Sequence, residues 1–217
     1  LDGSYDLNRE TYNGELTLSR FPLDRFLTVD SLGSASANFR LEGRYFSWPQ
    51  AKTSVNAGIR QLFYKEHEYK DITLQATLDK THLRGTMVSK DPDAPLDLVF
   101  RGDSLQQQYQ VGLGGYIGKV DLQALHLMQE PLTMGLKVDL QGFIGEHSAY
   151  ALKARFDSLS MADSRKTYTL GSLDIDMASD LKKTTLDVKT GDLQLTFRAD
   201  TSLAGFGESA GKIAGIV

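Results

Sequence analysis

The pentapeptide Gly207-Glu208-Ser209-Ala210-Gly211 matches the Gly-x-Ser-x-Gly pattern of a nucleophile elbow. In hydrolases of that kind the serine is exposed on a tight strand-to-helix turn, and an acid and then a histidine follow it in the chain. Here six residues follow Gly211, and every histidine precedes the motif: His67, His82, His126 and His147. The sequence therefore predicts no catalytic residue, no cofactor and no enzyme. The motif indicates instead the small-residue start of a helix.

Two other groups of residues carry side chains that could do chemistry. Glu66-His67-Glu68 offers metal-ligand types, but alternate residues of a strand point to opposite faces, so the two glutamates would oppose the histidine. A solvated turn, and no metal site, is predicted there. Asp174 and Asp176 share one face of a predicted strand, which indicates a polar outer face rather than a catalytic carboxylate pair.

The elements that position these residues are predicted to be strands. Hydrophobic and polar residues alternate strictly in nine segments, which is the pattern of a strand with one buried face. Such half-buried strands are typical of antiparallel sheets. The segments are 16–18, 35–41, 74–78, 96–100, 111–113, 134–140, 150–156, 173–177 and 193–197.

Helical signal is confined to three short stretches. Residues 21–27 contain a proline suited to a first helical turn, and residues 119–127 carry apolar side chains at helical spacing. A third stretch begins at Phe206, where apolar residues recur at the same spacing up to Val217. The sequence thus predicts an all-β protein with a few short helices.

The chain also repeats itself. Leu41-Glu42-Gly43 corresponds to Leu140-Gln141-Gly142, an offset of 99, and the segment 98–103 corresponds to 195–200, an offset of 97. The difference of two is predicted to lie in one loop, at 90–95 against 189–192. We expect residues 1–13 to end a preceding repeat, 14–105 and 106–203 to form two β-repeats, and 204–217 to begin a C-terminal helix or linker.

Composition excludes several function classes. The formal net charge is -4, whereas a nucleic-acid binder needs a concentrated basic face. The sequence contains no run of about 18 apolar residues, which is the length that a membrane-spanning helix needs. The absence of cysteine excludes a disulfide framework. The first residue is Leu1 rather than Met, which indicates a piece of a longer protein.

The order of these motifs resembles the AsmA-like superfamily, most closely its TamB branch, over most of residues 1–203. The resemblance lies in strands of alternating hydrophobic and polar residues that are separated by glycine and proline. The motifs are Leu1 to Tyr5, a Gly14-x-Leu16-x-Leu18 strand, Phe21-Pro22-Leu23, Asp30-Ser31-Leu32-Gly33, Phe39-x-Leu41-x-Gly43 and the segment Tyr69-Lys70-Asp71-Ile72. The resemblance implies an elongated, twisted antiparallel sheet whose concave face forms an open apolar groove.

The same resemblance implies a role between two membranes. It suggests a periplasmic protein anchored in the inner membrane that supports outer-membrane biogenesis, by phospholipid transport or by assembly of outer-membrane proteins. Phospholipid acyl chains and an outer-membrane barrel assembly partner are the partners that it implies. The full-length family has an N-terminal membrane helix and further repeats that this chain lacks.

A physical argument stands beside the resemblance and allows either an open groove or a closed sandwich. A sheet with one apolar face must cover that face with a sheet, a helix or a ligand, and the predicted helices are too few. Acyl chains need only apolar surface, at about 0.8 kcal/mol per buried CH₂. The alternative is a structural β-sandwich, an interaction or adhesin-type module, in which the same residues form a closed core. The predicted lining residues are Leu16, Leu18, Phe39, Leu41, Leu74, Leu78, Leu96, Leu98, Phe100, Leu113, Leu136, Val138, Leu152, Phe156, Ile175, Leu193, Leu195 and Phe197.

An open groove makes a further prediction about charged substitutions. Water would reach a carboxylate on an open face, so Phe39→Asp, Leu98→Asp and Phe197→Asp are expected to leave the fold intact while interrupting the apolar path.

Overall fold

The computed structural model describes residues 2–25, 31–45, 47, 50–105, 108–145 and 149–202. These residues form one antiparallel sheet of thirteen strands in which every strand pairs with its neighbour in the chain. The strands are β1 (Asp2–Asp6), β2 (Thr11–Pro22), β3 (Leu32–Arg44), β4 (Lys52–Tyr64), β5 (His67–Asp79), β6 (His82–Ser89), β7 (Leu96–Leu105), β8 (Gln108–Asp121), β9 (Leu132–Ile144), β10 (Tyr150–Asp163), β11 (Thr167–Ser179), β12 (Thr184–Thr190) and β13 (Leu193–Ala199). The predicted all-β, open antiparallel sheet is confirmed.

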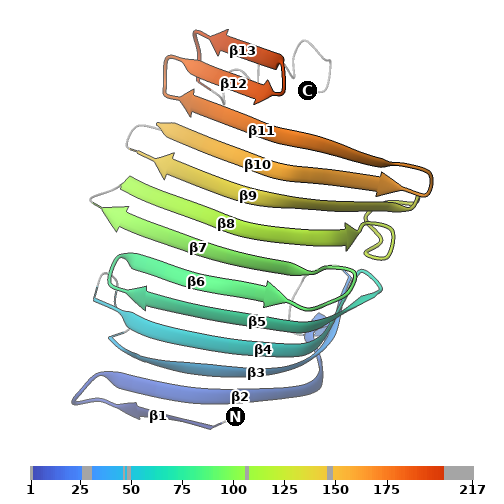
Figure 1. Ribbon diagram of the computed structural model, residues 1–217. Helices are drawn as coiled ribbons and strands as arrows, with labels where there is room; N and C mark the ends of the chain where they lie inside the picture. The colour runs from blue at the N-terminus through green and yellow to red at the C-terminus, as the bar shows by residue number, and fades with distance from the viewer. Residues whose placement is uncertain are drawn as a thin grey trace.

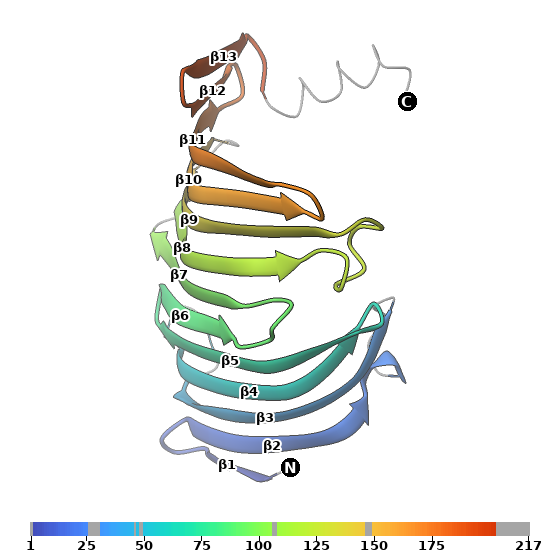
Figure 2. The same cartoon turned by 45° about the vertical axis from the view of Figure 1, so that its right-hand side comes forward.

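The sheet is a single stack of strands running from β1 at one end to β13 at the other (Figure 1). It does not close into a barrel, since β1 and β13 lie at opposite ends of the strand order. Figure 2 shows that β2 to β5 are bowed along their length, so the layer is curved as well as twisted. Right-handed twist of this kind follows from the backbone sterics of L-amino acids.

The helix predictions are mostly wrong. Residues 21 and 22 end β2, and only a short 3₁₀ turn, η1 (Leu23–Arg25), follows them. Residues 119–121 end β8, and residues 122–127 form turns. The Asp121 carboxylate accepts hydrogen bonds from the backbone N–H groups of Gln123 and Ala124, both at 3.0 Å. A side chain that caps the backbone in this way favours a turn over a helix. The stretch predicted to be helical from Phe206 lies outside the described residues.

The internal repeat is visible in the irregularities of the sheet. The register between β2 and β3 shifts between Leu18 and Phe21, and the register between β8 and β9 shifts between Ile117 and Val120. Both positions differ by 99 residues (117 − 18 and 120 − 21), the offset found in the sequence. Bulges bend a strand and increase its twist, so the sheet turns at equivalent places in its two halves.

The strand pairing keeps the same offset through four strands. The row Leu16, Phe39, Ala57 and Leu74 corresponds to the row Gly115, Val138, Phe156 and Leu173, each pair separated by 99. Beyond these four strands, the difference in residue number between equivalent positions of the two halves changes. It changes at two hairpins, whereas the sequence predicted a change in one loop. The hairpin after β11 is longer than the one after β5, and the hairpin after β12 is shorter than the one after β6.

The boundary predicted near residue 105 does not interrupt the sheet. Strands β7 and β8 pair along their whole length, from Leu96 with Ile117 to Leu105 with Gln108. The two predicted repeats are therefore halves of one continuous layer in the part of the chain that the structure describes.

Candidate functional site: one apolar face

All eighteen predicted lining residues lie on the same face of the sheet, here called the apolar face. Side chains that pair directly across antiparallel strands share a face, and so do residues two apart along a strand. They fall on four neighbouring rows. One row runs across Leu16, Phe39, Ala57, Leu74, Met87, Leu98, Gly115, Val138, Phe156, Leu173, Thr190 and Leu193.

The remaining rows continue the same surface. The adjacent row runs across Leu41, Val55, Ala76, Gly85, Phe100, Leu113, Leu140, Ala154, Ile175, Val188 and Leu195. The next contains Leu78, Leu152 and Phe197, and the last, on the other side of the first row, contains Leu18, Leu96 and Leu136. The apolar surface is therefore continuous from β2 to β13.

Burial on this face comes from the crowding of its own side chains. Leu98, Leu136 and Val138 form a small buried cluster at the centre of the sheet, with exposures of 9, 8 and 3%. Apart from these three, Leu125 and six alanines complete the buried apolar side chains among the described residues. No second sheet and no α-helix within the described ranges covers the face. Towards the β13 end the face becomes open, since Leu193 and Leu195 are 67 and 57% exposed.

Glycines on the apolar face make room for large neighbours at equivalent points of the two halves. A Cβ on Gly43 would lie within 2.6 Å of the Tyr12 ring, and a Cβ on Gly142 would lie 2.7 Å from the Val111 side chain. Both pairs of facing residues differ by the repeat offset of 99. The Leu-x-Gly correspondence in the sequence therefore has a packing cause.

The opposite face, here called the polar face, is a charged surface. Asp174 and Asp176 lie on it, as predicted, and they pair with cations from the neighbouring strand. Arg155 Nη1 lies 3.6 Å from Asp174, and Lys153 Nζ lies 3.6 Å from Asp176. These groups line a shallow hollow of about 620 Å³ together with further carboxylates and amides. Such a surface suits water and ions and opposes an acyl chain, because burying its charges would require desolvation.

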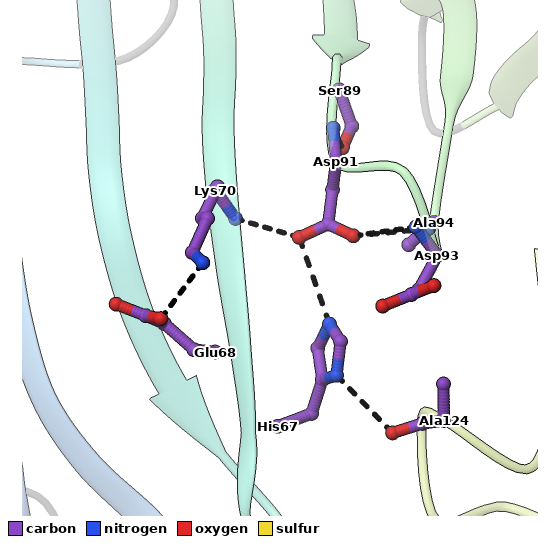
Figure 3. Close-up of polar contacts among 8 residues, drawn as sticks. All are labelled: His67, Glu68, Lys70, Ser89, Asp91, Asp93, Ala94 and Ala124. Carbon is purple, nitrogen blue, oxygen red and sulfur yellow. Dashed lines mark hydrogen bonds and ion pairs between the residues drawn. The ribbon is translucent and has the colours of Figure 1, made fainter.

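A separate polar cluster lies where three hairpin ends meet, and Figure 3 shows its contacts. The Asp91 carboxylate is 1% exposed and accepts hydrogen bonds from the backbone N–H groups of Lys70 at 2.8 Å, Asp93 at 2.9 Å and Ala94 at 3.2 Å. It therefore fixes the loop between β6 and β7 to the start of β5. Burial, then the nearby Asp91 charge, raises the pKa of Tyr69 on the same strand.

His67 belongs to this cluster, so the solvated turn predicted at 66–68 is wrong for this residue. Its side chain is 10% exposed, its Nε2 lies 3.6 Å from Asp91 Oδ2, and its Nδ1 lies 3.2 Å from the carbonyl oxygen of Ala124. Glu68 faces away from it and pairs with Lys70 Nζ at 2.9 Å. Glu68 therefore lies apart from the histidine, whose ring meets carboxylates from elsewhere in the chain.

The Asp91 cluster is not among the predicted sites, because its partners lie far apart in the chain. The signal available was the acidic loop Asp91-Pro92-Asp93, in which an aspartate precedes a proline turn and can cap the following N–H groups. The Gly-x-Ser-x-Gly motif at 207–211 lies outside the described residues.

Within the described residues, no helix has the length and apolar character needed to cross a bilayer. No protein-family model, no curated protein and no solved structure matches the chain.

Proposed function

We propose that this chain is a segment of an AsmA/TamB-like protein of the periplasm that supports outer-membrane biogenesis, and that its apolar face contacts phospholipid acyl chains. One observation carries the proposal. The apolar rows run without a break from β2 to β13, and no described sheet or helix covers them.

The energetics favour acyl chains over polar ligands on this face. Each CH₂ removed from water gains about 0.8 kcal/mol, and no hydrogen bond has to be matched. Neighbouring rows offer equivalent contacts, because each strand presents alternate apolar side chains at a regular spacing. A chain that moves from one strand to the next therefore exchanges one apolar contact for a similar one, which suits transport better than capture.

The wider setting belongs to the same proposal. An inner-membrane anchor and an outer-membrane barrel assembly partner would lie at the two ends of a longer sheet. The proposal includes neither a catalytic residue nor a cofactor.

The alternative function is a structural interaction module, which was predicted as a β-sandwich with a closed core. The described strands form one layer, so the chain does not fold its apolar face onto itself as a sandwich. Two copies that pack face to face could still cover the apolar rows, and the experiment below distinguishes that arrangement from lipid contact.

The test places a photo-crosslinking amino acid at exposed positions of each face. Leu41, Leu83 and Leu195 are 39, 38 and 57% exposed on the apolar face. Glu42, Arg84 and Gln194 are their neighbours on the polar face and serve as matched controls. After irradiation with phosphatidylethanolamine and phosphatidylglycerol vesicles, mass spectrometry should find phospholipid adducts at the three leucine positions and few at the controls.

Two outcomes would contradict the proposal. Equal adduct yields on both faces would mean that the apolar rows do not select lipid. Chain-to-chain adducts from the leucine positions, without lipid adducts, would support the face-to-face module instead.

A further inference from the structure

The His67 cluster holds a buried nitrogen that has no hydrogen-bond partner among the residues the structure describes. This nitrogen is His67 Nε2, and the side chain is nine-tenths buried. The other ring nitrogen, Nδ1, lies 3.2 Å from the Ala124 carbonyl oxygen, which can only accept. Nδ1 must therefore carry the proton in this contact, and in the neutral ring the Nε2 lone pair points into the cluster.

That lone pair faces negative charge. Asp91 Oδ2 lies 3.6 Å from Nε2, which is too long for an N–H to oxygen hydrogen bond. The ligand atoms of His67, Asp91 and Asp93 all lie within 4.8 Å of one another. Figure 3 shows the imidazole and the two carboxylates around a common space. Two acceptors facing each other in a buried site repel, and a cation between them would remove that repulsion.

The surrounding charges leave this position open to a cation. The Lys70 ammonium pairs with Glu68 at 2.9 Å, and Lys70 contacts Asp91 through its backbone N–H instead. Among the described residues, the one ion pair that either aspartate makes is that of Asp91 with His67. A divalent ion would neutralise both carboxylates.

We propose that His67 Nε2, Asp91 Oδ2 and the Asp93 carboxylate bind a divalent transition-metal ion of the Zn²⁺ type, which clamps the ends of the β4–β5 and β6–β7 hairpins together. Mixed nitrogen and carboxylate donors favour such ions over Mg²⁺ and Ca²⁺. Tetrahedral ligands at normal zinc distances lie about 3.3 Å apart, close to the observed 3.6 Å between His67 and Asp91. The Nδ1 contact with a backbone carbonyl is the arrangement that orients a metal-binding histidine.

The test is titration of the tag-free, chelator-treated chain with Zn²⁺, followed by calorimetry. We expect one ion per chain, and at least about tenfold weaker binding in Asp93→Asn and His67→Ala. Asp93→Asn is the cleaner variant, because Asp93 holds its loop through its backbone: its N–H donates to Asp91 and its carbonyl accepts from Asp121. His82→Ala is the matched control, since His82 also contacts an aspartate, Asp103, but on an exposed site already neutralised by Arg84.

A second measurement keeps the proposal testable if His67→Ala unfolds. Addition of Zn²⁺ should shift the NMR signal of His67 Nε2 and leave that of His82 unchanged. The proposal is overturned if the unaltered chain binds no stoichiometric Zn²⁺, or if Asp93→Asn binds it as tightly. A His67 ring found doubly protonated at neutral pH would likewise overturn it, in favour of a proton-linked ion pair with Asp91.

Discussion

Asp103 at the end of β7 is held by two cations from β6. His82 Nδ1 contacts its Oδ1, and Arg84 Nη2 lies 2.8 Å from the same oxygen. The hydrogen bond with His82, and then that with Arg84, lowers the pKa of the Asp103 carboxyl below its ordinary value. A lowered folded-state pKa means that the ionised form stabilises the fold above the unfolded-state pKa, near 4. That stabilisation is lost as the pH falls through the lower folded-state pKa.

Asp103→Asn should therefore destabilise the chain at pH 5 to 7, and the difference from the unaltered protein should shrink as the pH falls below about 4. Thermal unfolding followed by circular dichroism between pH 7 and pH 2 checks this. A stability difference that stays constant down to pH 2 would show that Asp103 acts through packing rather than charge.

Position on the apolar face decides how a charge is tolerated there. Leu98 lies in the buried central cluster, so Leu98→Asp should cost several kcal/mol and unfold much of the chain. Leu195 is 57% exposed, so Leu195→Asp should shift the urea midpoint only slightly. This differs from the sequence-based expectation that a charge anywhere on the face leaves the fold intact. Similar midpoints for the two variants would mean that the centre of the face is wetter than the packing indicates.

At the scale of single strands, the backbone of β8 depends on one glycine. Gly115 has φ +144, and a Cβ there would lie 2.1 Å from the carbonyl oxygen of Asp97 on β7. Gly115→Ala should therefore destabilise the chain by about 1–3 kcal/mol, through backbone strain and separation of β7 from β8. Gly58→Ala on β4 is the control, because a Cβ there meets nothing within 4 Å. Urea unfolding of the two variants should differ by at least the lower figure, and equal midpoints would argue against a strained β7–β8 contact.

The strands and their faces were predictable because alternation is a local property. A residue such as Phe39 reveals its face from its neighbours at 37 and 41. The helix predicted over residues 119–127 is absent from the structure, because the Asp121 carboxylate caps a turn where apolar spacing favoured a helix. The His67 cluster could not be predicted, since it depends on hairpins that come together only in the folded sheet. The local sequence pattern therefore predicts which face of the sheet a residue occupies. The clusters between hairpins depend on contacts between segments that are far apart in the chain.

For the whole molecule, the two end strands determine how it associates. Each of β1 and β13 pairs with a single described strand, and Leu193 and Leu195 of β13 are largely exposed on the apolar face. Sheet edges and exposed apolar patches both promote association. Leu193→Lys with Leu195→Lys should reduce self-association measured by light scattering without lowering the unfolding temperature by more than a few degrees. Gln194→Lys, on the polar face of the same strand, is the control and should change association less. Equal effects would assign association to net charge rather than to the apolar face.

The unbroken sequence of hairpins also bears on how the chain acquires its structure. Every described strand pairs only with the strands immediately before and after it, so no strand pairing waits for a distant segment. Short sequence separation lowers the loop-closure cost and speeds folding. Each new strand can add to the edge left by the previous one as it leaves a ribosome or a translocation channel. Such a sheet can grow vectorially, with its most recent edge always serving as the template for the next strand.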